Sequence, residues 1–487
     1  MIAKQDLQRP TAALVPALIA GCALASAATF LAINGLWLWL AVAGGVGAVL
    51  ILMTIRPINL LLLAFCFLPF QSLLNDLFAG QVPGVAIAKD ALMVVVYAST
   101  FLYFLAPQRR IYLDRTIYWF LFFAVAGAVY IAFSPNPIRA VLQLRFLSLY
   151  PLIMLLLANA VEEREDLNRL LQWIAAIGVV AVVYGLLQYL FLFDVPYRNA
   201  GGSVKLRMVR FGDELGIVST FANRPTFGGY LVPLFLLFLR VDLWPSWRGA
   251  RVLRTVMLGA SGLCLVLTYS RSSWLGLLVG LLVVCYFYDK FKTILGGVAL
   301  AAALIAFYSV QHLYFSAELT EATTSSESLT ERLDYWPRVF GHVAANPLGL
   351  GLGMVGGYHL FEAGAEADAY GNLQSDPYTS FDSAGRTGAD NILSVTDNAY
   401  LKLLVQGGFP LLLIFLGAVL AVMRAVPEVL RTVPDQWSHD VAVWSIASFA
   451  ALLTICMFVD FFEAAPAIAL YWLAIGVLPC LRKQSQI

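Results

Sequence analysis

Residues 170–193 read LLQWIAAIGVVAVVYGLLQYLFLF, a stretch without a charge in which nearly every side chain is apolar. A helix needs about 20 such residues to cross the hydrocarbon core of a bilayer. Runs of this kind recur along the chain, and 60% of its 487 residues are hydrophobic while 13% are charged. A soluble core stops growing near ~250–300 residues, so this much apolar surface needs lipid as its solvent. The sequence therefore predicts an all-α, polytopic transmembrane helical bundle.

We identify 14 apolar runs as candidate spans. The third is the weakest because Pro69 interrupts it. The runs divide the chain into N-terminal transmembrane helices (1–193), a central transmembrane region (194–310), a large loop (311–397) and C-terminal transmembrane helices (398–487). The spans lie near 11–31, 36–55, 58–75, 90–106, 116–133, 146–161, 170–193, 226–239, 254–270, 273–288, 293–310, 398–423, 441–461 and 465–481.

Lysines and arginines predict the orientation, because cytoplasmic loops carry an excess of them. With the N-terminus inside, 18 of the 31 basic residues fall in cytoplasmic segments and 4 fall in short outside loops. Both termini are then cytoplasmic, and the segments near 194–225 and 311–397 lie outside. The outside four are Lys89, Arg139, Arg145 and Arg271, and the inside ones are Lys4, Arg9, Arg56, Arg109, Arg110, Arg115, Arg164, Arg169, Arg240, Arg248, Arg251, Arg254, Lys290, Lys292, Arg424, Arg431, Arg482 and Lys483.

The loop over 311–397 has a soluble-like composition, with 12 acidic residues. Thr330–Ala345 has helical periodicity, and Asn346-Pro347 predicts its end, with a kink or break at Pro337. The sequence thus predicts one long outside, periplasmic loop that contains short helices.

Other classes of site are poorly represented. The six cysteines lie in apolar runs without CxxC spacing, and the four histidines lack metal-ligand spacing, so no metal site is predicted. The net charge is +1 without a basic tract, so no nucleic-acid partner is predicted either.

Arg271 lies in Thr268-Tyr-Ser-Arg-Ser-Ser-Trp-Leu-Gly276, between two spans with almost no loop. A charge there is costly unless it is paired, faces a cavity or binds an anion. The next helix is expected to start at about Ser272, so its free N–H groups and its dipole favour the same anion. The sequence favours a phosphate-binding arginine here, and the alternative is an arginine that reaches water at the membrane interface.

Three other arginines are candidates with an ordinary structural alternative. Arg332 lies four residues before Trp336 in Thr330-Glu-Arg-Leu-Asp-Tyr-Trp336, which suits a shared helix face or a solvated salt-bridged face. Arg210 and Arg224 lie close to or within Ser219-Thr-Phe-Ala-Asn-Arg-Pro-Thr-Phe-Gly-Gly-Tyr230, just before a span, where anchoring a helix end is the alternative role.

The last cluster is Asp397-Asn-Ala-Tyr-Leu-Lys-Leu-Leu-Val-Gln-Gly-Gly408, which opens a span. An Asp-Asn pair at such a place acts by default as an N-cap, worth about 1 kcal/mol. Taken singly, none of these motifs names a function.

Taken in order, the motifs resemble those of the O-antigen polymerase and ligase family, which also contains exopolysaccharide polymerases. The matching motifs are Thr-Phe-x-Asn-x-Pro before a span, Ser-Arg-x-x-Trp-Leu-Gly at a span junction, Arg-x-x-x-Trp in the large loop, the trailing Asn346-Pro-Leu-Gly-Leu-Gly-Leu-Gly353 and Asp-Asn-x-Tyr-Leu at the next span. They cover roughly residues 200–420, and the first seven spans match in hydropathy alone.

The resemblance implies a membrane glycosyltransferase in the bacterial inner membrane, with its active site at the periplasmic face. Its donor is an undecaprenyl-diphosphate-linked oligosaccharide, and it uses no metal, nucleotide sugar or other cofactor. The resemblance also implies membrane lipid and a chain-length regulator or export protein as partners.

The same resemblance assigns roles to residues of this chain. Catalytic roles fall to Arg271 and Arg332, which neutralise the diphosphate leaving group, and to Asp397 as the base. Substrate-binding roles fall to Arg210, Arg224, Tyr335, Trp336, Asn398 and Tyr400, the aromatic ones by stacking on sugars.

Two departures from the family pattern bear on the activity. Asp397 stands where ligases of this family usually have histidine, and Gln406 stands where an acidic residue is common. Asp-Asn is more typical of the exopolysaccharide polymerases, so polymerisation of repeat units is favoured. The alternatives are a ligase that transfers the glycan to lipid A core or another acceptor, and, in another class, a polysaccharide transporter or flippase. The position of the charges argues against a flippase, which carries charges along a pathway at mid-membrane depth. The candidate arginines lie at the outer face instead, and Lys402 is the one basic residue placed well inside a predicted span.

Overall fold

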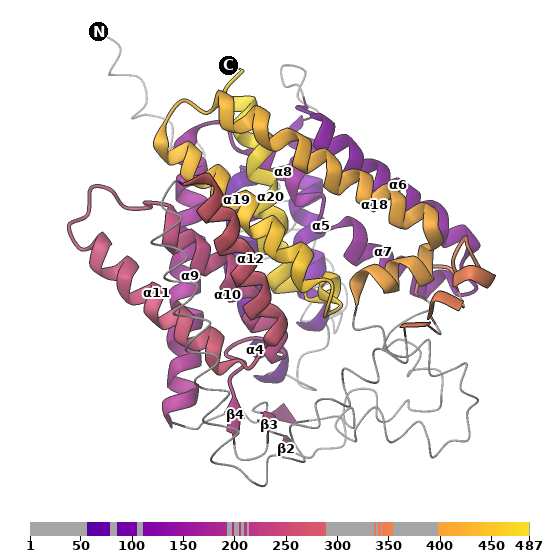
Figure 1. Ribbon diagram of the computed structural model, residues 1–487, viewed down its shortest axis with the longest axis horizontal. Coiled ribbons are helices and arrows are strands. Elements are labelled where there is room, and N and C mark those ends of the chain that lie inside the picture. Colours follow the sequence, from indigo (N-terminus) through magenta and orange to yellow (C-terminus); the bar gives the residue numbers. More distant parts are fainter. Residues whose placement is uncertain are drawn as a thin grey trace, which may run out of the picture.

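The structure is a computed structural model that describes residues 56–77, 85–104, 111–191, 197–198, 204–205, 209–211, 214–288, 336–353 and 398–486, apart from 338 and 342. The described chain is predominantly helical, as the sequence predicts (Figure 1). Its helices are α3 (Pro57–Phe67), η1 (Leu68–Phe70), α4 (Gln71–Leu77), α5 (Val85–Phe104), α6 (Arg115–Phe133), α7 (Pro137–Ser148), α8 (Ile153–Ala160), α9 (Arg164–Phe191), α10 (Arg224–Arg240), α11 (Ala250–Leu267), α12 (Arg271–Phe287), α18 (Ala399–Thr432), α19 (Gln436–Ile455), η3 (Phe461–Glu463) and α20 (Ala465–Gln484).

Four short strands interrupt the helical order in the segment that follows α9. They form two antiparallel ribbons, β1 (Tyr197–Arg198) with β2 (Val204–Lys205), and β3 (Val209–Phe211) with β4 (Glu214–Gly216). The sequence predicts an outside loop here without strands. The strands lie at the end of the bundle opposite the C-terminus (Figure 1).

Eight helical segments among the described residues are long and apolar enough to cross a membrane. They start at Pro57, Arg115, Ala140, Arg164, Ala250, Ala399, Gln436 and Pro466. Three further predicted spans coincide with α5, α10 and α12. The spans predicted near 11–31, 36–55 and 293–310 lie outside the described residues. The total of 14 spans and the four-region division therefore stay predictions.

Local sequence explains where several helices begin and bend. Asp114, Asn223 and Asp435 each accept a hydrogen bond from a backbone N–H in the first turn of the helix that follows. At Pro69 the third predicted span changes into the short 3-10 turn η1 and continues as α4. In lipid such a break is tolerated because the neighbouring turns still satisfy the backbone.

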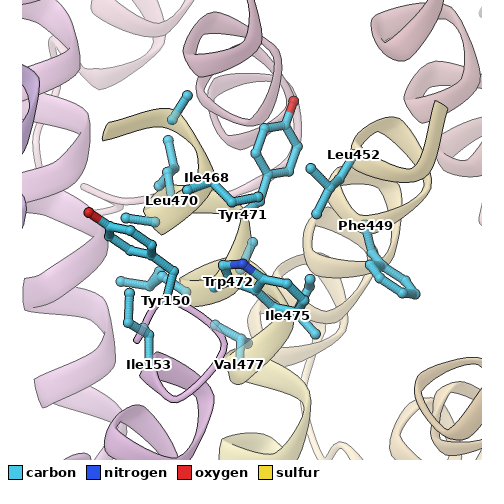
Figure 2. Packing of buried hydrophobic residues seen from close by; sticks show 14 of the residues in the cluster. Tyr150, Ile153, Phe449, Leu452, Ile468, Leu470, Tyr471, Trp472, Ile475 and Val477 are labelled. Atoms are coloured by element: carbon cyan, nitrogen blue, oxygen red, sulfur yellow. The ribbon is translucent and has the colours of Figure 1, made fainter. Parts of the chain in front are cut away.

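The core of the bundle is α20. In its candidate span 89% of the residues are buried inside the protein, against 28% in that of α6. Trp472 of α20 is fully buried, and its ring meets Phe120 of α6 edge-on with centroids 4.9 Å apart. Figure 2 shows Trp472 between Tyr150 and Ile153 on one side and Phe449 of α19 on the other. Helices such as α6 instead turn one face outward.

Small residues allow a close contact between α12 and α19. A Cβ atom at Gly276 of α12 would lie 3.2 Å from the Ala451 carbonyl oxygen of α19, and one at Gly280 would lie 3.3 Å from that of Ala447. This Gly-x-x-x-Gly pair lets the two backbones touch, as is common between membrane helices. The residue order also shows that α12 and α19 are antiparallel, so the start of α12 lies at the end of α19.

Candidate functional site

The first turn of α10 carries Arg224. Asn223 caps this helix by accepting a hydrogen bond at Oδ1 from the Thr226 N–H (2.9 Å), and Arg224 is the first helical residue. Its half-buried side chain lies on the backbone of Gly216 in β4, where a Cβ atom would come within 2.5 Å of Arg224 Cδ. The ribbon β3–β4 therefore covers one side of this arginine.

The first turn of α12 carries Arg271. A three-residue turn links α11 to α12, and Tyr269 in it has a left-handed backbone with φ of 52°. Arg271 is the first residue of α12, within one position of the predicted start, and its side chain is exposed. Ser270 at the N-cap makes no cap hydrogen bond within the described chain; its Oγ lies 2.8 Å from Ser273 Oγ. Within the described chain the Ser273 N–H donates to the Ser270 carbonyl (3.1 Å), which leaves the N–H groups of Arg271 and Ser272 at this helix start.

These two first turns are in contact. A Cβ atom at Gly228 of α10 would lie 2.7 Å from Ser273 Oγ and 3.1 Å from Ser270 Cβ of α12. Arg224 also lies close enough to Tyr269 for an electrostatic interaction between their side chains. The structure therefore places Arg224 and Arg271 at one end of the bundle, each as the opening residue of its helix.

Arg210 joins the same end through the backbone. It lies in β3, paired with Leu215 of β4, next to the Gly216 on which Arg224 rests. Arg332, Tyr335 and Asp397 lie outside the described residues.

The first turn of α18 is attached to the end of α19. Asn398 caps α18 by accepting hydrogen bonds at Oδ1 from the N–H groups of Tyr400 and Leu401, and its Nδ2 donates to the Met457 carbonyl (2.9 Å). The half-buried Tyr400 donates its hydroxyl to the Leu453 carbonyl (2.8 Å). Both predicted substrate-binding residues thus also fasten α18 to α19.

These contacts place the start of α18 with the starts of α10 and α12. The chain leaving α19 reaches Phe461, whose ring occupies the space beside Gly229 of α10. We call this end of the bundle the arginine end; it comprises the first turns of α10, α12 and α18 and the turn of residues 456–464. The positive ends of three helix dipoles meet there.

The Gly-rich segment 346–353 holds a kink in α18. Gly408 has φ of 62° inside the helix, which separates a short first part, residues 399–407, from the longer second part. The N–H groups of Leu350 and Gly351 donate to the carbonyls of Val405 (2.8 Å) and Gln406 (3.0 Å), and the Phe409 N–H donates to the Pro347 carbonyl (3.0 Å). The segment therefore satisfies the backbone groups that the kink releases.

The backbone geometry of this segment explains its glycines. Gly349, Gly351 and Gly353 all have positive φ, and a Cβ atom at Gly349 would lie 2.5 Å from both the Gln406 oxygen and the Gly408 nitrogen. Glycines are thus required there by close backbone approach. The long-range pairing with residues 405–409 is not encoded in any local spacing.

The described residues between Trp336 and Ala345 are helical and the helix ends before Asn346, as predicted. Val339 and Val343 of this helix are buried against Leu401, Leu404 and Val405 of α18, with Trp336 half-buried at the edge of the same cluster. Trp336 therefore lies beside the first part of α18, where sugar stacking is predicted for it.

An ion pair that sequence reasoning missed also lies at the arginine end. Lys402 Nζ is 2.6 Å from Asp460 Oδ2, and the side chains are only 5% and 17% exposed. The sequence singled out Lys402 by its depth in a span, but its partner is 58 residues away in the turn after α19. Within the described chain no three His, Cys, Asp or Glu side chains gather as a metal site requires.

Comparison with known proteins agrees with the motif order. The family model described as O-antigen ligase matches residues 255–416, which include Arg271, the Gly-rich segment 346–353 and the first part of α18. No curated protein matches the chain. The match confirms the resemblance that the motifs indicate: residues 255–416 of this multi-pass membrane protein are similar to the O-antigen ligase family.

Proposed function

We propose that the chain is a glycosyltransferase that polymerises undecaprenyl-diphosphate-linked oligosaccharide repeat units into exopolysaccharide or O-antigen. The observation that carries this proposal is the contact between the first turns of α10 and α12, each of which opens with an arginine. Two guanidinium groups beside two helix N-termini suit a diphosphate better than any neutral ligand.

In the proposed reaction a hydroxyl of the acceptor glycan attacks the anomeric carbon of the donor glycan. The bond from that carbon to the phosphate oxygen breaks, and undecaprenyl diphosphate leaves with the electron pair. Arg271 and Arg332, with Arg210 and Arg224, stabilise the charge that develops on the leaving group. The product has the inverted anomeric configuration, as a single displacement requires.

Asp397 takes the proton from the attacking hydroxyl. It directly precedes Asn398, whose cap and whose hydrogen bond to Met457 fix the start of α18 at the arginine end. Tyr335, Trp336 and Tyr400 contribute aromatic faces for the sugars. Carboxylate rather than imidazole at position 397 is what favours polymerase over ligase here.

We place the arginine end at the periplasmic face of the bacterial inner membrane. α10, α18 and α20 all start at the arginine end, and their last turns, at the opposite end, carry Arg240, Arg431, Arg482 and Lys483. This distribution supports a cytoplasmic opposite end by the positive-inside rule.

The test uses the purified full chain in proteoliposomes, with lipid-linked repeat units extracted from a polysaccharide-producing strain, EDTA, and lipid A core as a competing acceptor. We expect a ladder of longer lipid-linked glycans without added metal or nucleotide sugar. Transfer of single units to lipid A core without a ladder would make the chain a ligase. Movement of the donor across the bilayer without any new glycosidic bond would make it a flippase.

A further inference from the structure

The first part of α18, residues 399–407, is held from two sides. The Gly-rich segment 346–353 binds its far end at the Gly408 kink. On the other side the Ala399 N–H donates to the Cys456 carbonyl (3.0 Å), and Asn398 donates to Met457. The Lys402–Asp460 ion pair is the charged contact of this second side.

Stability is a weak explanation for that ion pair. Removing two charges from water is unfavourable, and well-packed apolar replacements of buried pairs are often neutral or stabilising. Ionisable residues within membrane helices are expensive and are retained mainly where function needs them. Lys402 is buried one turn inside α18, at the end where the proposed chemistry takes place.

The ion pair also links the two halves of the proposed site. Asp460 is followed directly by Phe461, whose ring would overlap a Cβ atom at Gly229, five residues after Arg224. Lys402 lies four residues after Asn398, in the turn that follows Asp397. A chain of contacts therefore runs from the first turn of α18, which directly follows the proposed base in sequence, through Lys402, Asp460 and Phe461, to the helix that carries a proposed phosphate ligand.

We propose that Lys402 and Asp460 are positioning residues, which hold the start of α18 in register with the start of α10 so that base and leaving group face the same anomeric carbon. This role rests on the proposed function. Neither side chain need touch the substrate. Their effect is geometric, and a misplacement of about 1 Å at a reacting centre costs on the order of 10²-fold in rate.

The experiment compares kinetics of two apolar double variants of the purified full chain. In K402M/D460L the pair is replaced by side chains of similar size. The matched control is R240M/D440L, because Arg240 and Asp440 form a part-buried ion pair of 2.7 Å where α10 ends and α19 begins, away from the arginine end. We expect kcat of K402M/D460L to fall about 10²-fold while KM for the donor changes less than about threefold. The control should keep kcat.

D460E covers the case in which K402M/D460L does not fold. It keeps the charge and the fold but adds one methylene, so it should lower kcat about tenfold with an unchanged melting temperature. Hydrogen exchange over residues 398–407 should be faster in both variants. Wild-type kcat in folded K402M/D460L, or in D460E, would overturn the positioning role alone. A wild-type chain that forms no new glycosidic bond would overturn the proposed function and this role together.

Discussion

At the scale of single residues, the arginine that opens α12 makes the sharpest demand on side-chain shape. Arg271 is exposed at a helix start without a side-chain cap. A planar guanidinium can bridge two phosphate oxygens, and an ammonium cannot. We therefore expect Arg271→Lys to lower polymerisation at least about tenfold although the charge is kept. Arg251→Lys, at the opposite end of α11, is the matched control. Near-normal polymer from Arg271→Lys at equal protein level would leave an interfacial anchor as its role.

Substitutions of Asp397 can distinguish a chemical role of this residue from a capping role. A cap needs only a short acceptor, so Asn or Ser would cost at most about 1 kcal/mol of stability. Asn398 already supplies the two cap bonds of α18. As a general base, Asp397 must accept a proton, so Asp397→Asn should lose a factor of roughly 10²–10⁴ in rate, with partial recovery in Asp397→His. Polymerisation rates of the variants with purified lipid-linked repeat units, measured together with their melting temperatures, distinguish the two roles. An Asn variant within about threefold of wild type would place the base elsewhere.

At the scale of elements, the kink of α18 depends on one glycine. Gly408 has φ of 62°, and a Cβ atom there would lie 2.2 Å from the Pro347 oxygen. Gly408→Ala should therefore displace the segment 346–353 and destabilise the protein by about 1–3 kcal/mol or more. Gly259→Ala in α11 is the control, because no atom lies within 4 Å of its Cβ position. Equal melting temperatures for the two variants would mean that the segment does not clamp the kink.

The elements also show what sequence reasoning can reach in a membrane protein. Apolar runs predict helices such as α9 and α19 well, since lipid forces backbone hydrogen bonds inside each span. They do not predict which helix is central, because lipid is as apolar as a protein core. α20 is the buried centre although its run is no more apolar than the others.

The parts of the site that depend on a local motif were predictable from the sequence. The parts that depend on contacts between distant segments were not. Arg271 at a span junction and the end of the helix before Asn346 follow from spacing and are confirmed as placements. The partners of Lys402 and of the Gly-rich segment are separated from them in sequence and depend on how α18, α19 and the loop pack. The strands β1–β4 were missed because their two- and three-residue lengths leave no alternation to read.

At the scale of the whole molecule, the proposed function requires the arginine end to lie outside the cytoplasm. Ala345 and Ser485 are exposed positions at opposite ends of the bundle. In intact inner-membrane spheroplasts, Ala345→Cys should react with an impermeant thiol reagent and Ser485→Cys should react only after lysis. The described native cysteines are buried or half-buried, so the unsubstituted chain gives the background. The reverse pattern would invert the topology and remove the periplasmic site.

The proposed function requires that the arginine end bind the lipid-diphosphate donor. A photoreactive amino acid at Ala222, exposed just before the start of α10, would lie beside that donor, and one at Ser485 would not. After irradiation with radiolabelled undecaprenyl-diphosphate glycan, we expect a labelled adduct at position 222 that excess unlabelled donor abolishes, and none at 485. An adduct at 485 alone, or none at either position in a chain that polymerises, would contradict it.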